Sequence, residues 1–138
     1  MKEITSSSGA VVGAVKTWVR LEAVLVFLLS VLLYSRIGLA WKWFFVFFLA
    51  PDLSMLPYLA NPRAGAISYN LFHNYALPLA VAAFCVAFQH PAVMPYILIW
   101  TAHIGIDRFL GYGLKYPEAF GRTHLGVLGK TTVVDRAS

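Results

Sequence analysis

Charged residues are scarce in this chain of 138 residues. They make up 12% of the sequence, whereas hydrophobic residues make up 59%. Ordinary soluble domains carry about 25% charged residues, and a small soluble domain exposes too much surface to cover it with half that share. The composition therefore excludes a typical cytosolic globule, and the high hydrophobic content excludes a disordered chain.

Cysteine and acidic residues are also few. The single cysteine, Cys85, has no second cysteine to bond with, so the chain is not a disulfide-stabilised scaffold. Six acidic residues against eleven basic ones leave a net charge of +5. Because the basic residues sit in short segments beside apolar runs, they indicate contact with anionic lipid headgroups and not with nucleic acid.

Long apolar runs predict the fold class. The stretch from Ala64 to Ile106 has no charged residue and can cross a bilayer twice, at about 20 residues per crossing. Together with the apolar runs that precede it, this stretch predicts transmembrane helices at about 17–38, 41–60, 71–89 and 91–110. A polar C-terminal tail is predicted from about 117. Tyrosines near the segment ends, Tyr69 among them, fit anchoring at the membrane interface. We expect a single all-α transmembrane domain over residues 1–138, an integral membrane bundle of four antiparallel helices with short turns.

The basic residues predict the orientation of this bundle. Four crossings place the N-terminal flank, the 61–70 loop and the C-terminal flank on one side, together with nine of the eleven basic residues. Arg36 and Lys42 are the two on the other side. By the positive-inside rule, both termini are expected in the cytoplasm.

Five ionisable residues fall within the predicted spans, where such residues are costly and usually functional. At about 1.5 Å of rise per residue, all five lie in the cytoplasmic half of the membrane, although they come from four helices. His103 and Asp107 are spaced i, i+4 and share one helical face. Two imidazoles and up to three carboxylates suit Zn²⁺, Mn²⁺ or Fe²⁺. The five residues are Glu22, Asp52, His73, His103 and Asp107.

This donor set predicts a metal-dependent hydrolase that acts on a lipid or amphiphilic ester at the cytoplasmic side, because a bound metal lowers the pKa of water toward neutrality. Glu22 is expected to be a ligand or the catalytic general base. The predicted metal ligands are Asp52, His73, His103 and Asp107. The predicted substrate-binding residues are Arg63, Arg108 and Lys115, which could attract an anionic headgroup, and His124, which could fold back over the site.

Other interpretations stay open. Each candidate also has a purely structural reading, such as a helix cap, an interfacial charge pair or a packing histidine. The same groups could form the relay of a proton- or ion-coupled transporter or channel, for which so small a bundle would have to form a homo-oligomer. The protein could instead be a non-catalytic accessory subunit packed against a larger membrane partner.

Several stretches of this sequence resemble the bacterial membrane-protein family known as domain of unknown function 4260. The resemblance extends from about residue 17 to 126. It implies a small multi-helix protein of the bacterial inner membrane, and it implies no particular activity. The stretches are Arg20-Leu-Glu22, Leu49-Ala-Pro-Asp-Leu-Ser-Met55, Tyr69-Asn-Leu-Phe-His73, Ala102-His-Ile-Gly-Ile-Asp-Arg108, Gly111-Tyr-Gly-Leu-Lys-Tyr116 and Thr123-His-Leu-Gly126.

A weaker similarity is to the LexA-regulated inner-membrane metal-dependent hydrolases. Their pattern joins a Pro-Asp near one helix end, a histidine that opens another helix, and a later histidine shortly before an aspartate. Pro51-Asp52, His73 and His103-Ile-Gly-Ile-Asp107 look like this pattern in the same order. The chain departs from it at Ser54 and Asn74, where those proteins tend to carry further charged or ligand residues. The similarity implies a divalent metal and hydrolysis by analogy.

Overall fold

The computed structural model describes residue 11 and residues 13–117 and 122–127 of the chain. This part holds the α-helices α1 (Gly13–Ile37), α2 (Trp41–Phe48), α3 (Pro62–Phe72), α4 (Ala76–Ala87) and α5 (Met94–Leu110). It also holds the 3₁₀ helices η1 (Ala50–Leu59) and η2 (Pro91–Val93). Two antiparallel two-residue strands, β1 (Arg122–Thr123) and β2 (Gly126–Val127), form a small hairpin. The prediction of a helical fold is confirmed.

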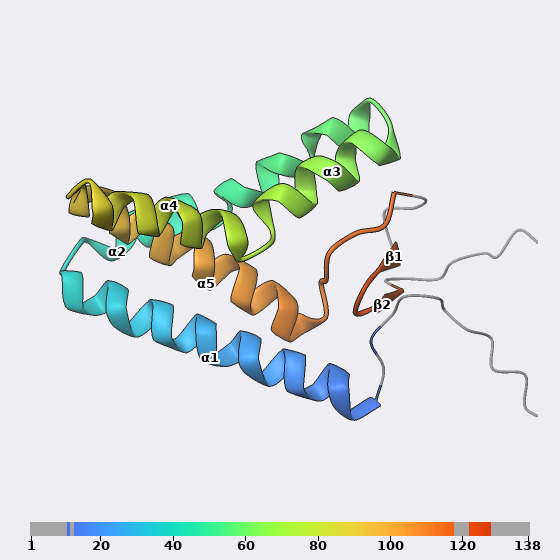
Figure 1. The fold of residues 1–138 in the computed structure, drawn as a ribbon, viewed down its shortest axis with the longest axis horizontal. Coiled ribbons are helices and arrows are strands. Elements are labelled where there is room, and N and C mark those ends of the chain that lie inside the picture. Colours follow the sequence, from blue (N-terminus) through green and yellow to red (C-terminus); the bar gives the residue numbers. More distant parts are fainter. Residues whose placement is uncertain (1–10, 12, 118–121, 128–138) are drawn as a thin grey trace, which may run out of the picture.

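Helices α1 and α5 run antiparallel and pack side by side over most of the length of α5, with α1 along one edge of the fold (Figure 1). They approach closely at Gly105, where a Cβ atom would lie 2.8 Å from the Ala23 carbonyl oxygen. Small residues allow such close contact between helices in a membrane. The hydroxyls of Ser30 and Thr101 hydrogen-bond across the same interface at 2.8 Å. The hydrophobic core next to this pair consists of Tyr34, Phe44, Ile99 and Ala102.

The predicted continuous helix over 41–60 is wrong. Helix α2 ends at Phe48, and Ala50–Leu59 forms the 3₁₀ helix η1. Pro51 and Pro57 lack a backbone N–H and cannot extend an α-helical ladder. The break places Asp52 in the first turn of a new element, where its side chain can point toward α5.

The predicted loop at 61–70 is also wrong, because α3 occupies it. The Asn61 side-chain oxygen accepts a hydrogen bond from the Ala64 amide at 2.8 Å, and Pro62 fills the first turn, as is typical of a helix start. Helix α3 packs along η1 (Figure 1). The helix predicted at 71–89 is therefore broken at residues 73–75, between α3 and α4, which meet at a bend of 41°.

The first and last predicted helices agree with the structure. The range 17–38 corresponds to α1, and 91–110 corresponds to η2 followed by α5. Gly111 ends α5 with φ +98°, a conformation that favours glycine. The predicted polar tail from about 117 contains the β1–β2 hairpin, which reaches back to residues 112–116 through a bridge between Lys115 and Thr123. The two ends of the chain lie outside the described residues.

One described helix, α1, is long and apolar enough to cross a membrane by itself. The bent pair α3–α4 meets the same criterion only when the two helices are counted as one span. Large apolar side chains are exposed on several helices, including Leu25 at 63%, Phe45 at 69% and Val86 at 68%. The four-span arrangement and its orientation stay predictions.

Candidate metal centre

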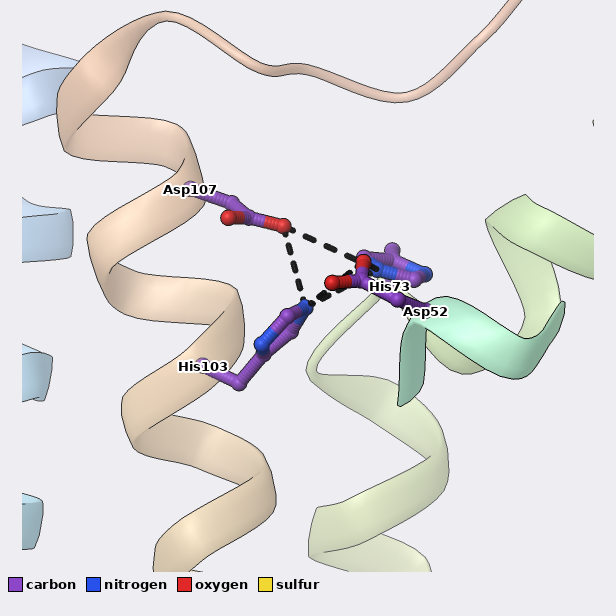
Figure 2. Close-up of side chains that lie close together, drawn as sticks. All are labelled: Asp52, His73, His103 and Asp107. Atoms are coloured by element: carbon purple, nitrogen blue, oxygen red, sulfur yellow. Dashed lines mark hydrogen bonds and ion pairs between the residues drawn. The ribbon is translucent and has the colours of Figure 1, made fainter. Parts of the chain in front are cut away.

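Four polar side chains from three elements converge at the middle of the fold (Figure 2). Asp52 comes from the first turn of η1, and His73 is the residue at which α3 ends. His103 and Asp107 lie one turn apart on α5 and point toward the other two side chains. One ligand atom of each residue lies within 4.8 Å of the ligand atoms of the other three. This group is called the His-Asp cluster below.

The distances within the His-Asp cluster match those expected around a single ion. The Nε2 atoms of His73 and His103 are 3.1 Å apart. Asp107 Oδ2 is 3.1 Å from His103 Nε2 and 3.6 Å from His73 Nε2, and Asp52 Oδ1 is 3.3 Å and 3.4 Å from the same two atoms. Ligand atoms about 2.0–2.1 Å from a tetrahedral zinc ion lie about 3.3–3.4 Å from one another. The four residues therefore form a cluster that could hold a metal ion.

A backbone hydrogen bond sets the tautomer of His73. Its Nδ1 atom lies 3.0 Å from the carbonyl oxygen of Tyr69, which can only accept a hydrogen bond. Nδ1 therefore carries the proton in the neutral imidazole, and Nε2 presents its lone pair to the cluster. The Ser54 hydroxyl lies 3.4 Å from the same Nδ1 atom. Such contacts behind a ligand histidine hold its ring in orientation and raise its basicity.

The two kinds of donor differ in burial. The side chains of His73 and His103 are 3% and 2% exposed, whereas those of Asp52 and Asp107 are 34% and 21% exposed. The imidazoles thus form the floor of the cluster, and the carboxylates form its accessible side. A metal held here would be reached past the carboxylates.

Tyr69 and Arg108 hold His73 in place from outside the His-Asp cluster. The Tyr69 ring stacks on the His73 ring, with centroids 3.8 Å apart and planes 11° apart. Arg108, next to Asp107 on α5, donates a hydrogen bond from Nη2 to the His73 carbonyl oxygen at 3.3 Å. Its guanidinium also lies 4.9 Å from the Tyr75 ring centre. Helix α5 therefore contributes two members of the cluster and also holds the residue that ends α3.

Lys115 brings a second cation close to the His-Asp cluster. Its side chain is buried, and its Nζ atom lies 4.8 Å from the centre of the Tyr69 ring that stacks on His73. Asn70 fixes the backbone of Lys115 on both sides, accepting from its N–H at 2.6 Å and donating to its carbonyl at 2.7 Å. Burial lowers the pKa of Lys115, while the negative charge of Asp107 acts in the opposite direction.

Three other predicted site residues lie elsewhere. Glu22 is exposed on α1 and is not a member of the His-Asp cluster, so its role as ligand or general base stays a prediction. Arg63 is exposed in the first turn of α3, about 15 Å along that helix from His73, because the expected loop is helical. His124 accepts a hydrogen bond from the Leu114 amide at 2.8 Å and so supports the segment that carries Lys115. Burial lowers the pKa of His124, and the charge of Arg108 lowers it further.

Sequence reasoning missed the residues that support the site. Tyr69 was assigned to the membrane interface, but it is buried against His73. Asn70 and Ser54 were given no role in the site. The i, i+4 spacing of Tyr69 and His73 was a signal that the two side chains lie on one helical face.

A family model matches residues 16–128 of the chain. The chain belongs to the family described as domain of unknown function (DUF4260). It matches none of the curated proteins and none of the solved structures with which it was compared. The part matched by DUF4260 contains all four residues of the His-Asp cluster and also Lys115 and His124. The family assignment confirms the first resemblance, whereas the similarity to membrane metal-dependent hydrolases stays an analogy.

Proposed function

We propose that this DUF4260 protein is a metal-dependent hydrolase of the bacterial inner membrane that cleaves an anionic amphiphilic ester at the cytoplasmic side. The observation that carries the proposal is the set of five distances of 3.1–3.6 Å that join the two histidine nitrogens to each other and to the two carboxylate oxygens. Four separate structural roles would not require atoms from three elements to meet at the spacing of one coordination shell.

The donor set favours a borderline transition metal. Two imidazoles and two carboxylates suit Zn²⁺, Mn²⁺ or Fe²⁺ better than Mg²⁺ or Ca²⁺, which prefer oxygen ligands alone. When bound, such an ion supplies a Lewis acid and lowers the pKa of a water molecule toward neutrality. Histidines as well buried as His73 and His103 keep their positions and exclude bulk water from the floor of the site.

The remaining groups have assignable roles. Asp52 is the more exposed of the two carboxylates, and only its Oδ1 atom lies at the two histidines, so its Oδ2 atom would accept a proton from a water at the site. Arg108 and Lys115 would attract the anionic part of the substrate, since both lie against residues that contact His73. Glu22 and Arg63 are not needed for these steps.

Two features support a membrane location. Helix α1 can span a bilayer by length and composition, and only 17% of its apolar 18-residue stretch is buried within the protein. Leu25, Phe45 and Val86 on three helices expose apolar surface of a kind that soluble monomers rarely present over large areas. A four-span bundle with both termini in the cytoplasm would cover this surface with lipid and would place the cluster near the cytoplasmic headgroups.

The test is an ester hydrolysis assay with purified protein in vesicles, after chelation and after return of Zn²⁺, Mn²⁺ or Fe²⁺. We expect hydrolysis of a short-chain anionic phosphoester or carboxyl ester to depend on the returned metal and to be lost in Asp107→Asn. Hydrolysis that survives chelation, or none with any of the three metals, would contradict the proposal. A metal-independent proton flux in the same vesicles would favour the transport alternative.

A further inference from the structure

An apolar cavity begins directly beside the His-Asp cluster. Its volume is about 240 Å³, and its walls are Phe47, Ala50, Pro51, Phe72, Tyr96 and Trp100. Two of these residues, Pro51 and Phe72, are the chain neighbours of Asp52 and His73. The cavity therefore has in its walls the chain neighbours of two of the four candidate metal ligands, while the ligands themselves do not line it.

Helix α5 joins this cavity to the metal centre along one face. Tyr96, Trp100, His103 and Asp107 follow one another at spacings of four, three and four residues, so their side chains form one stripe. Tyr96 lies about 10 Å from His103 along the helix axis, in the direction away from Asp107. Lys115 lies beyond the end of α5 on the Asp107 side, with its Nζ atom 4.8 Å from the centre of the Tyr69 ring that stacks on His73. One face of α5 thus runs from the possible metal site to the apolar cavity, and the cation Lys115 lies beyond the metal-site end of that face.

The cavity walls are braced by contacts that leave their shape defined. Trp100 donates a hydrogen bond from its indole nitrogen to the Phe72 carbonyl oxygen at 2.7 Å, and the two rings stack with centroids 5.9 Å apart. Across the cavity, Phe47 and Tyr96 meet edge to face, with centroids 5.2 Å apart. These aromatic pairs fix a slot whose volume lies below the roughly 300–1,000 Å³ typical of sites for larger ligands.

We infer that this cavity holds the single alkyl or acyl chain of the substrate, with the substrate's anionic group toward Lys115 and its scissile ester bond at the His-Asp cluster. The inference rests on the proposed function and adds the substrate class, a single-chain anionic amphiphile, and the direction in which it lies. An apolar chain gains free energy for every methylene that enters the slot. Phe47, Tyr96 and Trp100 would then determine the preferred chain length.

Two other apolar cavities make good controls. One, of about 400 Å³, lies between η1 and α3 and shares Ala50, Pro51 and Phe72 with the slot, while Ser54 and Ser68 add hydroxyl groups to its walls. The labelled peptides distinguish it from the slot, because Tyr96 and Trp100 line the slot alone. The other, of about 430 Å³, lies among α1, α4 and α5, is lined by Ala82 and shares no residue with the slot. Neither cavity is lined by Tyr96 or Trp100 of the α5 stripe, so neither is assigned to the alkyl chain of the substrate.

The experiment is photo-crosslinking of the full protein in phosphatidylglycerol and phosphatidylcholine vesicles with an octylphosphonate that carries a diazirine at the end of its chain. We expect the labelled peptides to contain residues 47–51 and 96–100. Ala50→Trp, which fills the slot, should reduce labelling about tenfold, the loss expected when two methylenes can no longer be buried. The matched control Ala82→Trp should leave labelling unchanged. Unmodified octylphosphonate should compete with the probe, and ethylphosphonate should not.

Several results would overturn the inference. These are labelling spread evenly over the lipid-facing helices, labelling centred on residues 53–57 and 68 or on the cavity near Ala82, or an Ala50→Trp protein that keeps its metal content and its labelling. If Ala50→Trp fails to fold, the competition by octylphosphonate but not ethylphosphonate decides the matter in the wild type. Crosslinking needs no catalytic turnover. A lack of labelling would therefore contradict the alkyl-chain site, whereas a lack of hydrolysis would contradict the proposed function. Labelling of the slot should survive chelation, because Lys115 and not the metal is assigned to the anionic group; labelling that is lost on chelation would contradict this assignment.

Discussion

The Nε2 atoms of His73 and His103 lie 3.1 Å apart, although the two residues come from different helices and 30 positions separate them in the chain. Both imidazoles present this nitrogen to the carboxylates of Asp52 and Asp107. A hydrogen bond between the two rings can use one proton at most, whereas a divalent ion accepts both lone pairs at once. This relationship is the reason for assigning a metal to the site.

The ring of Tyr69 should contribute to metal affinity although it is not a ligand. Tyr69→Leu removes the ring that stacks on His73, and we expect metal affinity to fall by about tenfold, as for other outer contacts of ligand histidines. Tyr69→Phe keeps the ring and should retain wild-type affinity. Competition with a chelating dye measures both constants. Equal affinities for the two variants would show that the stacked ring does not hold His73.

Lys115 should act on the charge of the substrate. Lys115→Met is expected to lower kcat/KM for an anionic ester by about tenfold or more, since a buried cation near the site is lost. The same variant should hydrolyse an uncharged ester of equal chain length at the wild-type rate. A loss of the same size for both esters would mean that Lys115 supports the fold of residues 112–117 and does not bind the substrate.

Docking of the hairpin should depend on pH through His124. Its pKa is lowered in the folded protein by burial and by Arg108, so the folded state favours the neutral ring, which accepts the Leu114 amide hydrogen bond. Stability from this contact is complete above the ordinary histidine pKa of about 6.5 and is lost as the pH falls below it.

Hydrogen exchange of the Leu114 amide measures this effect. Exchange corrected for intrinsic rate should be faster at acid pH than at neutral pH in the wild type and in the control His90→Gln, whose altered residue is exposed in a distant turn. In His124→Phe the amide should exchange fast at both pH values. Protection of the wild-type amide that is independent of pH would contradict the assigned hydrogen bond.

The contact between α1 and α5 should tolerate no side chain at Gly105. Gly105→Leu places atoms where the Ala23 carbonyl and the Phe27 backbone lie, and we expect a loss of about 1–3 kcal/mol in the free energy of unfolding. Ala83→Leu, at an exposed position of α4, should change stability by much less. Unfolding in mild detergent compares the two. A Gly105→Leu protein as stable as the wild type would show that the two helices do not meet at this residue.

The His-Asp cluster could be predicted from the sequence because ionisable residues are costly among apolar ones and therefore stand out. The i, i+4 pair His103 and Asp107 also shares one helical face whichever residues end the helix, because α5 is continuous through both. Asp52 and His73 are predicted as ligands because they fall within the predicted spans, whereas in the structure they lie at the start of η1 and at the end of α3. Their positions follow from helix ends that hydropathy does not reveal.

The breaks in the helices could not be predicted from hydropathy alone. Pro51 and Pro57 change the backbone from α-helical to 3₁₀ without changing the apolar character of the segment. Asn61 and Pro62 are residue types typical of a helix start, but this segment is predicted to be a turn. The position of Lys115 depends on Asn70, which is 45 positions away, and no local pattern reports such a contact.

The most direct test of the central claim is the metal content of the protein after gentle purification in detergent. Elemental analysis of the wild type should find close to one equivalent of Zn, Mn or Fe, and the His73→Ala/His103→Ala protein should hold almost none. His90→Gln, altered at an exposed histidine outside the His-Asp cluster, should keep the wild-type amount. A wild-type protein that carries no metal and takes up none of the three ions when they are added would contradict the account.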